Sequence, residues 1–396
     1  MKRLFLLVSL LFGLTLAAFA QNQQAINKIS INSAVLGEER VVLVRTPAGY
    51  DKNKQQYPVL YMTDGAAQLG HTIATTEFLV RNGRMSDLII VAITNTDRTR
   101  DLTPTNATLE ISPGQPTQFP TAGGADKFLK FIETELIPKI ESSYRVQPYR
   151  IFAGHSFGGL FTLHAFLTRP EVFNAYIAVS PTMEWDNHLL SRKAEAFFKD
   201  RKTLNRTLYI TLANEGGETK VGFERFKAIM SKSSPKGFSW GSALMEDEDH
   251  GSVVLRSHYD GLRKVFEGWQ MTGEVASLDQ VETHYKDLSA KFNYSILPPE
   301  AMMNQFGYQM MARGKMDEAV AIFKTNIKNY SQSANVYDSL GECYEKHGKL
   351  DLAKSNYEKA VQVGAQTNDP NLQLFKTNFD RVNEVLRKST EAKGNR

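Results

Sequence analysis

Residues 25–270 alternate short apolar runs with segments of helical periodicity. The runs are rich in Ile, Val, Leu and Tyr, which favour strands. Between two of them, Phe128, Ile132, Leu136 and Ile140 recur every four residues and predict one buried helix face. The alternation predicts an α/β fold, a mainly parallel sheet with helices on both faces and antiparallel hairpin strands at its start. Strands are expected at 28–32, 40–45, 58–61, 88–93, 150–153, 176–179, 208–212 and 241–245.

The C-terminal third has a longer period, because four small or aromatic residues recur 34 positions later. The recurring pairs are Gly307 and Gly341, Gly314 and Gly348, Ala319 and Ala353, and Phe323 and Tyr357. This spacing resembles that of tetratricopeptide helix pairs, in which small residues let two helices cross closely. It predicts a small all-α region with two tetratricopeptide-like repeats over 300–365, after a helical connector at 271–299 and before a capping helix and tail at 366–396. Such repeats either present a surface to a protein partner or support the domain before them.

The segment Gly154-His155-Ser156-Phe157-Gly158 spells G-x-S-x-G between an apolar run and a helical pattern. A strand that turns sharply into a helix exposes the serine hydroxyl at the helix N-terminus, where backbone amides and the helix dipole can stabilise an oxyanion. Small flanking residues are needed because a Cβ would clash there. The alternative is a chance Gly/Ser turn. We predict that Ser156 is a nucleophile.

A serine nucleophile needs a base, and His250 is the histidine best placed to supply one. It follows a predicted strand and precedes a helix running from about residue 252 to 269, so a loop could carry it back to Ser156. The alternative is a helix-capping or solvated histidine. The other histidines lie before the serine, between the serine and any later strand, within helical patterns or in the C-terminal repeats.

The acid of a triad is expected between the serine and the histidine in the chain. Glu215 follows the run 207–212 closely, and Glu218 is the alternative. The acidic run 246–249 beside His250 is interpreted as a solvated loop that could raise the imidazole pKa. A metal site built from these carboxylates is a weak alternative, since no second histidine or cysteine stands at ligand spacing. We therefore predict no metal.

These residues carry a family resemblance that covers roughly residues 25–270. The chain resembles the putative-esterase branch of the α/β-hydrolases, the group that includes the ferric-siderophore esterases. The resemblance implies that Ser156 and His250 are nucleophile and base. It also implies an oxyanion hole shared between the amide of Phe157 and one near Gly65 or Ala66. The matching stretches are TPAGY at 46–50, YPVLYMTDG at 57–65, NTDR at 95–98, GHSFGG at 154–159, SPTMEW at 180–185 and HGS at 250–252.

The loop 95–124 is too long to serve only as a connection, because it holds four prolines and seven threonines with little hydrophobic periodicity. We predict that it forms part of the substrate pocket and that Arg98 or Arg100 meets a polar or anionic group. Alternatively, these arginines pair with Asp97 and Asp101 and hold the loop. Trp185 is predicted to be a pocket wall, with ordinary packing as the alternative.

The N-terminus predicts export. A basic start, an apolar stretch at 4–16 and Ala18-Phe19-Ala20 form the pattern of a secretory signal peptide over 1–20, with the mature domain at 21–270. No later stretch is apolar enough to span a membrane. Loss of Lys2 and Arg3 would lower the formal charge from +4 to +2, which favours neither nucleic acid nor an anionic membrane as a partner.

The features together predict an exported, periplasmic or secreted serine hydrolase without a cofactor, acting on a small-molecule or carbohydrate-linked carboxylic ester through an acyl-enzyme. One alternative is an acyltransferase on the same fold. Another is a tetratricopeptide interaction protein whose hydrolase domain is catalytically silent. Siderophore lactones, feruloyl or acetyl esters of polysaccharides, and small lipophilic esters all fit the predicted chemistry.

Overall fold

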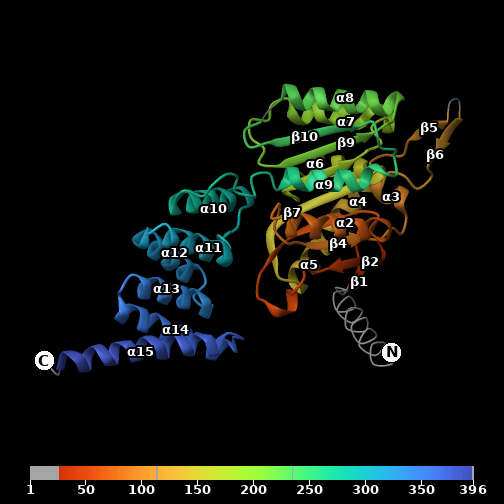
Figure 1. The fold of residues 1–396 in the computed structure, drawn as a ribbon. Coiled ribbons are helices and arrows are strands. Elements are labelled where there is room, and N and C mark those ends of the chain that lie inside the picture. The colour runs from red at the N-terminus through yellow and green to blue at the C-terminus, as the bar shows by residue number, and fades with distance from the viewer. Residues whose placement is uncertain (1–25, 113–114, 234, 395–396) are drawn as a thin grey trace, which may run out of the picture. The chain divides into compact units, whose positions relative to one another are not determined.

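The computed structural model describes residues 26–112, 115–233 and 235–394, and the predicted signal peptide lies outside these ranges (Figure 1). The chain divides between Gln270 and Met271 into two compact units. The first unit is built around one sheet, and the second is helical. No described helix has the length and apolar character needed to cross a membrane.

The first unit contains an eight-stranded sheet in the order β1-β2-β4-β3-β7-β8-β9-β10. The strands β1 and β2 form an antiparallel hairpin, and β2 also pairs antiparallel with β4. All other pairings are parallel. The predicted fold class is therefore confirmed, and each predicted strand overlaps one of this sheet. The bounds are β1 Ile26–Ser33, β2 Glu38–Arg45, β3 Tyr57–Met62, β4 Ile89–Ile93, β7 Val146–His155, β8 Ala175–Val179, β9 Thr207–Ala213 and β10 Ser239–Met245.

Helices cover the sheet, and they supply the core that the periodicity predicted. The face made by Phe128, Ile132, Leu136 and Ile140 is buried, although its helix passes through a π-helical turn at Ile132–Leu136. Two helices, α2 and α9, pack against each other, whereas α6 packs on β7 and β8 and against α7. The bounds are α2 Gly65–Arg81, α4 Ala125–Phe131, α5 Ile137–Ser143, α6 Phe157–Thr168, α7 Trp185–Phe198, α8 Gly217–Lys232 and α9 Val253–Val265.

The long loop after β4 has secondary structure of its own. It begins with the short helix α3 (Arg98–Leu102) and continues into the two-stranded hairpin β5 (Thr108–Ser112) and β6 (Gln115–Gln118). Asp97 caps α3 by accepting a hydrogen bond from the amide of Arg100. The loop is thus a folded insertion at the carboxyl end of β4, the edge of the sheet where open α/β folds bind ligands.

The second unit consists of six helices within the described residues. Two glycines let its helix pairs cross closely, because a Cβ on Gly307 would lie 2.5 Å from the ring of Phe323 and one on Gly341 would lie 2.7 Å from the ring of Tyr357. The two glycines stand 34 residues apart, and so do the two rings that they meet. Both rings are fully buried. The helices are α10 Leu278–Phe292, α11 Glu300–Ala312, α12 Met316–Asn329, α13 Ala334–Lys346, α14 Leu350–Thr367 and α15 Leu372–Gly394.

Candidate active site

Ser156 occupies a strained turn between β7 and α6. Its φ of 61° and ψ of −118° are unfavourable for a residue with a side chain. The flanking glycines explain how the turn closes. A Cβ on Gly154 would lie 2.3 Å from the Gly158 carbonyl oxygen, and one on Gly158 would lie 2.2 Å from Thr63 Oγ1. The G-x-S-x-G pattern is therefore a steric requirement of this turn.

Two helix N-termini start side by side at the carboxyl edge of the sheet. Ala153 of β7 pairs with Met62 of β3. The helix α6 starts at Phe157, and α2 starts at Gly65, directly before Ala66. Amides in the first turn of a helix have no intrahelical acceptor and carry a partial positive charge. The first turns that contain the amides of Phe157 and Ala66 thus begin at neighbouring strand ends.

Glu215 and His250 meet although 35 residues separate them in the chain. His250 Nδ1 lies 2.7 Å from Glu215 Oε1. Glu215 follows β9, and the next loop, after β10, is tied to it because the Asn214 amide donates to the Glu248 carbonyl at 2.9 Å. The parallel pairing of β9 with β10 brings these loops to one edge. The structure therefore places the predicted acid candidate against the predicted base candidate.

The hydrogen bond between these side chains changes both pKa values. The hydrogen bond to Glu215 raises the pKa of His250, against the opposing effect of burial. Burial pushes the pKa of Glu215 up, but hydrogen bonding and the charge of His250 outweigh it, so that this pKa is lowered. A carboxylate that holds an imidazole in this way fixes its tautomer, with Nδ1 protonated and Nε2 free to accept a proton.

His155 connects the serine turn to the histidine loop. Its ring centroid lies 4.6 Å from that of His250, and it directly precedes Ser156 in the chain. Burial, followed by the nearby His250, lowers the pKa of His155 to about 4, so that its imidazole is neutral near pH 7. The loop that holds His250 thus lies against the residue that precedes Ser156. His155 stands at a position that the G-x-S-x-G motif leaves open, so the motif gave no signal for this contact.

The other acidic residues near His250 have separate partners. Glu218, the alternative acid, contacts His188 Nε2 at 2.8 Å. Asp249 accepts hydrogen bonds from the amides of Gly251 and Ser252, and Asp247 pairs with Arg256. The acidic run at 246–249 therefore caps the start of α9 and pairs with it. Within the described residues, no group of three or more His, Cys, Asp or Glu side chains is arranged to hold a metal ion.

Arg98 lies at the site but pairs with a residue that the sequence analysis did not consider. Its Nε donates to Asp64 Oδ1 at 2.7 Å and its Nη2 to Asp64 Oδ2 at 3.1 Å. The same Nη2 donates to the His155 carbonyl at 3.2 Å, and the guanidinium lies over the ring of Phe157. Asp97, which the alternative interpretation paired with these arginines, instead caps α3 by accepting from the Arg100 amide. Arg100 does pair with Asp101, and also with Glu38.

Trp185 is packed inside the protein. Its side chain is 0 % exposed, and Nε1 donates to Thr105 Oγ1 at 3.1 Å. Its ring meets those of Phe119 and Phe157 at centroid distances of 5.5 and 5.4 Å. The expectation that Trp185 forms a pocket wall is therefore corrected: it is a buried residue that packs against the two phenylalanines. Its position immediately after a strand end did not reveal this burial.

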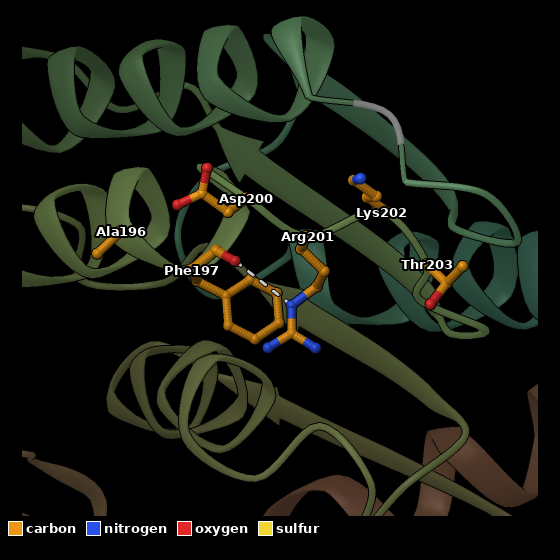
Figure 2. A pocket seen from close by; sticks show the side chains of 6 residues that line it. All are labelled: Ala196, Phe197, Asp200, Arg201, Lys202 and Thr203. Atoms are coloured by element: carbon orange, nitrogen blue, oxygen red, sulfur yellow. Dashed lines mark hydrogen bonds between the residues drawn. The ribbon is translucent and has the colours of Figure 1, made fainter.

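A hollow of about 410 Å³ lies at the opposite edge of the sheet. Figure 2 shows the Arg201 guanidinium beside the Phe197 ring there, with Arg201 Nε donating to the Phe197 carbonyl at 3.3 Å. Thr203 bridges to Lys236 just before β9 and β10 begin. The hollow thus belongs to the amino ends of the strands, whereas Ser156 and His250 follow carboxyl ends.

Comparisons with known proteins agree with this geometry. The family model described as "Putative esterase" matches residues 33–216, a range that includes Ser156 and Glu215 and ends before His250. The ferri-bacillibactin esterase BesA of Bacillus subtilis is 33% identical over 171 residues, which cover 40% of this chain and 58% of that protein. The siderophore triacetylfusarinine C esterase of Aspergillus fumigatus is 32% identical over 184 residues, covering 42% and 59%. The chain thus spans less than two thirds of either relative.

Solved structures extend the comparison to the fold. An IroE-like serine hydrolase from Shewanella oneidensis has a TM-score of 0.67 and 28% identity, covering 77% of this chain and all of that one. An uncharacterised protein from Capnocytophaga ochracea has a TM-score of 0.65 and covers 89% of this chain and all of that one. Its 16% identity shows the fold alone. In its sheet, its serine turn and these matches, the chain is similar to the putative-esterase branch of the α/β-hydrolases.

Proposed function

We propose that this protein is a serine hydrolase that cleaves carboxylic esters. The observation that carries the proposal is the contact of His250 with both Glu215 and the residue next to Ser156, at the N-terminus of α6. Ser156 Oγ attacks the ester carbonyl carbon while His250 Nε2 takes the hydroxyl proton. The amides of Phe157 and Ala66 stabilise the oxyanion. His250 then protonates the departing alcohol, which leaves an acyl-enzyme that water hydrolyses with the same histidine as base.

The names of the relatives support a substrate class. The printed names of two relatives identify siderophore esterases, of ferri-bacillibactin and of triacetylfusarinine C. We propose siderophore esters as the first substrates to test and keep feruloyl, acetyl and small lipophilic esters as the comparison series.

Labelling with a fluorophosphonate tests the nucleophile directly, and Ser156→Ala is its matched control. We expect the wild-type protein to be labelled and to hydrolyse at least one series in a panel of p-nitrophenyl esters, acetylated xylan and triserine-lactone siderophores. The Ser156→Ala variant should do neither. A wild-type protein that resists the label would instead favour the interaction protein with a silent hydrolase domain. Product partitioning towards added alcohols would favour acyl transfer.

We propose export as the location of this activity. The support is the signal-peptide pattern at 1–20. N-terminal sequencing of protein recovered from the periplasm or medium checks the proposal. A mature chain that begins at Gln21 supports it, and a protein that stays in the cytoplasm with Met1 in place contradicts it.

The helical unit adds a second candidate role, binding a protein partner. The support is a cavity of about 830 Å³ that is lined by Tyr308 on α11, Glu342 on α13 and Arg381 on α15, among other residues. Its polar groups are mostly paired, for example Tyr308 with Glu342 at 2.9 Å. A partner bound in this cavity should lose affinity for Asn335→Arg and keep it for Leu352→Ala, whose side chain lies outside the cavity. Equal binding by both variants would contradict the proposal.

A further inference from the structure

Ser180 stands at the end of β8 in a conformation that favours glycine. Its φ is 36°, and its side chain is almost fully buried. The Ser180 amide donates to the Thr211 carbonyl at 3.0 Å, which keeps the residue beside β9. Backbone strain at a residue with a side chain persists where the surroundings hold it, and it often marks a functional position. The hydroxyl is the feature that glycine would lack.

The Ser180 hydroxyl accepts a hydrogen bond. The amide of Ala213, the last residue of β9, donates to Ser180 Oγ at 2.9 Å. Oγ is therefore an acceptor in this contact, and its own hydrogen remains to be donated. Buried hydroxyls usually make both kinds of hydrogen bond. A buried acceptor should therefore lie close to Ser180.

Glu215 has such an acceptor. Its Oε1 contacts His250, whereas Oε2 is buried and receives no hydrogen bond of ordinary geometry from the described residues. The Glu215 amide donates to the Ala213 carbonyl at 2.7 Å, so the chain folds tightly over the residue that Ser180 holds. The two unmatched groups, a buried hydroxyl hydrogen and a buried carboxylate oxygen, thus belong to neighbouring side chains.

We propose that Ser180 is a positioning residue that donates its hydroxyl hydrogen to Glu215 Oε2. The carboxylate is then anchored through both oxygens, to Ser180 and to His250, and cannot rotate about its last carbon–carbon bond. The plane of the carboxylate sets the orientation of the His250 ring, and therefore the direction of its Nε2. This inference rests on the proposed function, in which that nitrogen is the base.

Several charged or titratable groups surround the pair. His250 interacts with Glu215, Arg98, Glu184, His155 and Asp249, and Glu215 interacts with His250 and His155. The Ser180 hydroxyl helps to lower the pKa of Glu215 by hydrogen bonding. When the hydroxyl is lost, the pKa of Glu215 should rise. The hydrogen bond to His250 should weaken as its alignment is lost, and the pKa of His250 should fall.

Ser180→Ala and Ser180→Gly test the proposal together. Both remove the hydroxyl, but only glycine adopts the observed φ without strain. We expect kcat on a neutral p-nitrophenyl ester to fall about 10-fold in both, with KM changed less than about twofold, because one hydrogen bond to a charged group is lost. NMR titration of the His250 ring, assigned with His250→Gln, should show a lower pKa in both variants. Ser191→Ala, which removes another buried hydroxyl, should match the wild type in each measurement.

Unchanged kcat and an unchanged His250 pKa in the two Ser180 variants would overturn the inference. A fall in kcat with an unmoved His250 pKa would overturn it as well, because a purely structural role would act in that way. The titration does not require activity. A wild-type protein without esterase activity would therefore contradict the proposed function, and the link between Ser180, Glu215 and His250 would still be decided. If Ser180→Ala does not fold, the less strained Ser180→Gly supplies the result.

Discussion

The Arg98 guanidinium donates hydrogen bonds to both carboxylate oxygens of Asp64, at 2.7 and 3.1 Å, and also to the carbonyl of His155. Asp64 is the N-cap of α2 and has a left-handed backbone conformation, and Asn95 donates to the same carboxylate. His155 is the residue before Ser156. One guanidinium therefore ties the turn that precedes the Ala66 amide to the turn that holds the serine.

The Arg98 clamp predicts a uniform loss of activity. Arg98→Ala should lower kcat/KM about 10- to 100-fold. The reason is that a small displacement of the Phe157 and Ala66 amides, the proposed oxyanion donors, raises the free energy of the transition state. The loss should be similar for neutral and anionic esters, as measured on matched p-nitrophenyl substrates. Arg225→Ala, which breaks an exposed pair with Glu195, is the control and should change little. A loss confined to anionic esters would show that Arg98 acts mainly on the substrate.

Glu215 should control the pH dependence of hydrolysis. The base must be neutral, and the hydrogen bond to Glu215 raises the pKa of His250, so kcat/KM should fall on acidification with a midpoint above 6.5. Glu215→Gln should move this midpoint to lower pH, and kcat should fall by about 10- to 1000-fold. Glu218→Gln is the matched control, since Glu218 contacts His188. If the midpoint moved in Glu218→Gln and not in Glu215→Gln, Glu218 would be the partner of the base in place of Glu215.

Gly154 should tolerate no side chain. In Gly154→Ala the new Cβ would lie 2.3 Å from a backbone oxygen, which cannot move as a flexible side chain would. We expect a loss of about 1–3 kcal/mol in the free energy of unfolding, measured by chemical denaturation, together with slower fluorophosphonate labelling. Gly70→Ala, at an open position in α2, should gain about 0.5–1 kcal/mol. Equal stability of the two variants would show that the turn relaxes.

The helical unit should depend on the aromatic residues at its crossings. Phe323 is fully buried against Gly307, so Phe323→Ala should cost about 3–5 kcal/mol. Far-UV circular dichroism during denaturation measures this loss. Leu352→Ala, at a residue that is 47% exposed, should change stability by less than about 0.5 kcal/mol. Similar effects of the two substitutions would mean that the crossing is not tightly packed.

Local patterns were sufficient to predict most of the architecture. The apolar runs correspond to strands, and the face of Phe128, Ile132, Leu136 and Ile140 is buried, because periodicity records which side of an element avoids water. The G-x-S-x-G segment likewise forms the strained turn at Ser156, since the clash that Gly154 avoids is with Gly158, four residues later in the chain. The insertion after β4 was recognised as a long loop, but its hairpin was not.

Contacts between distant loops required the tertiary structure. Glu215 and Glu218 follow the same strand, and only the fold brings Glu215 to His250 and Glu218 to His188. In the same way Arg98 contacts Asp64, 34 residues earlier, and Trp185 is covered by Phe119 and Phe157. Hydrophobic spacing and motifs report on local geometry and on burial of a face. The partner of a charged or aromatic side chain depends on which loops the strand order brings together, and one sequence alone does not contain a local signal for that.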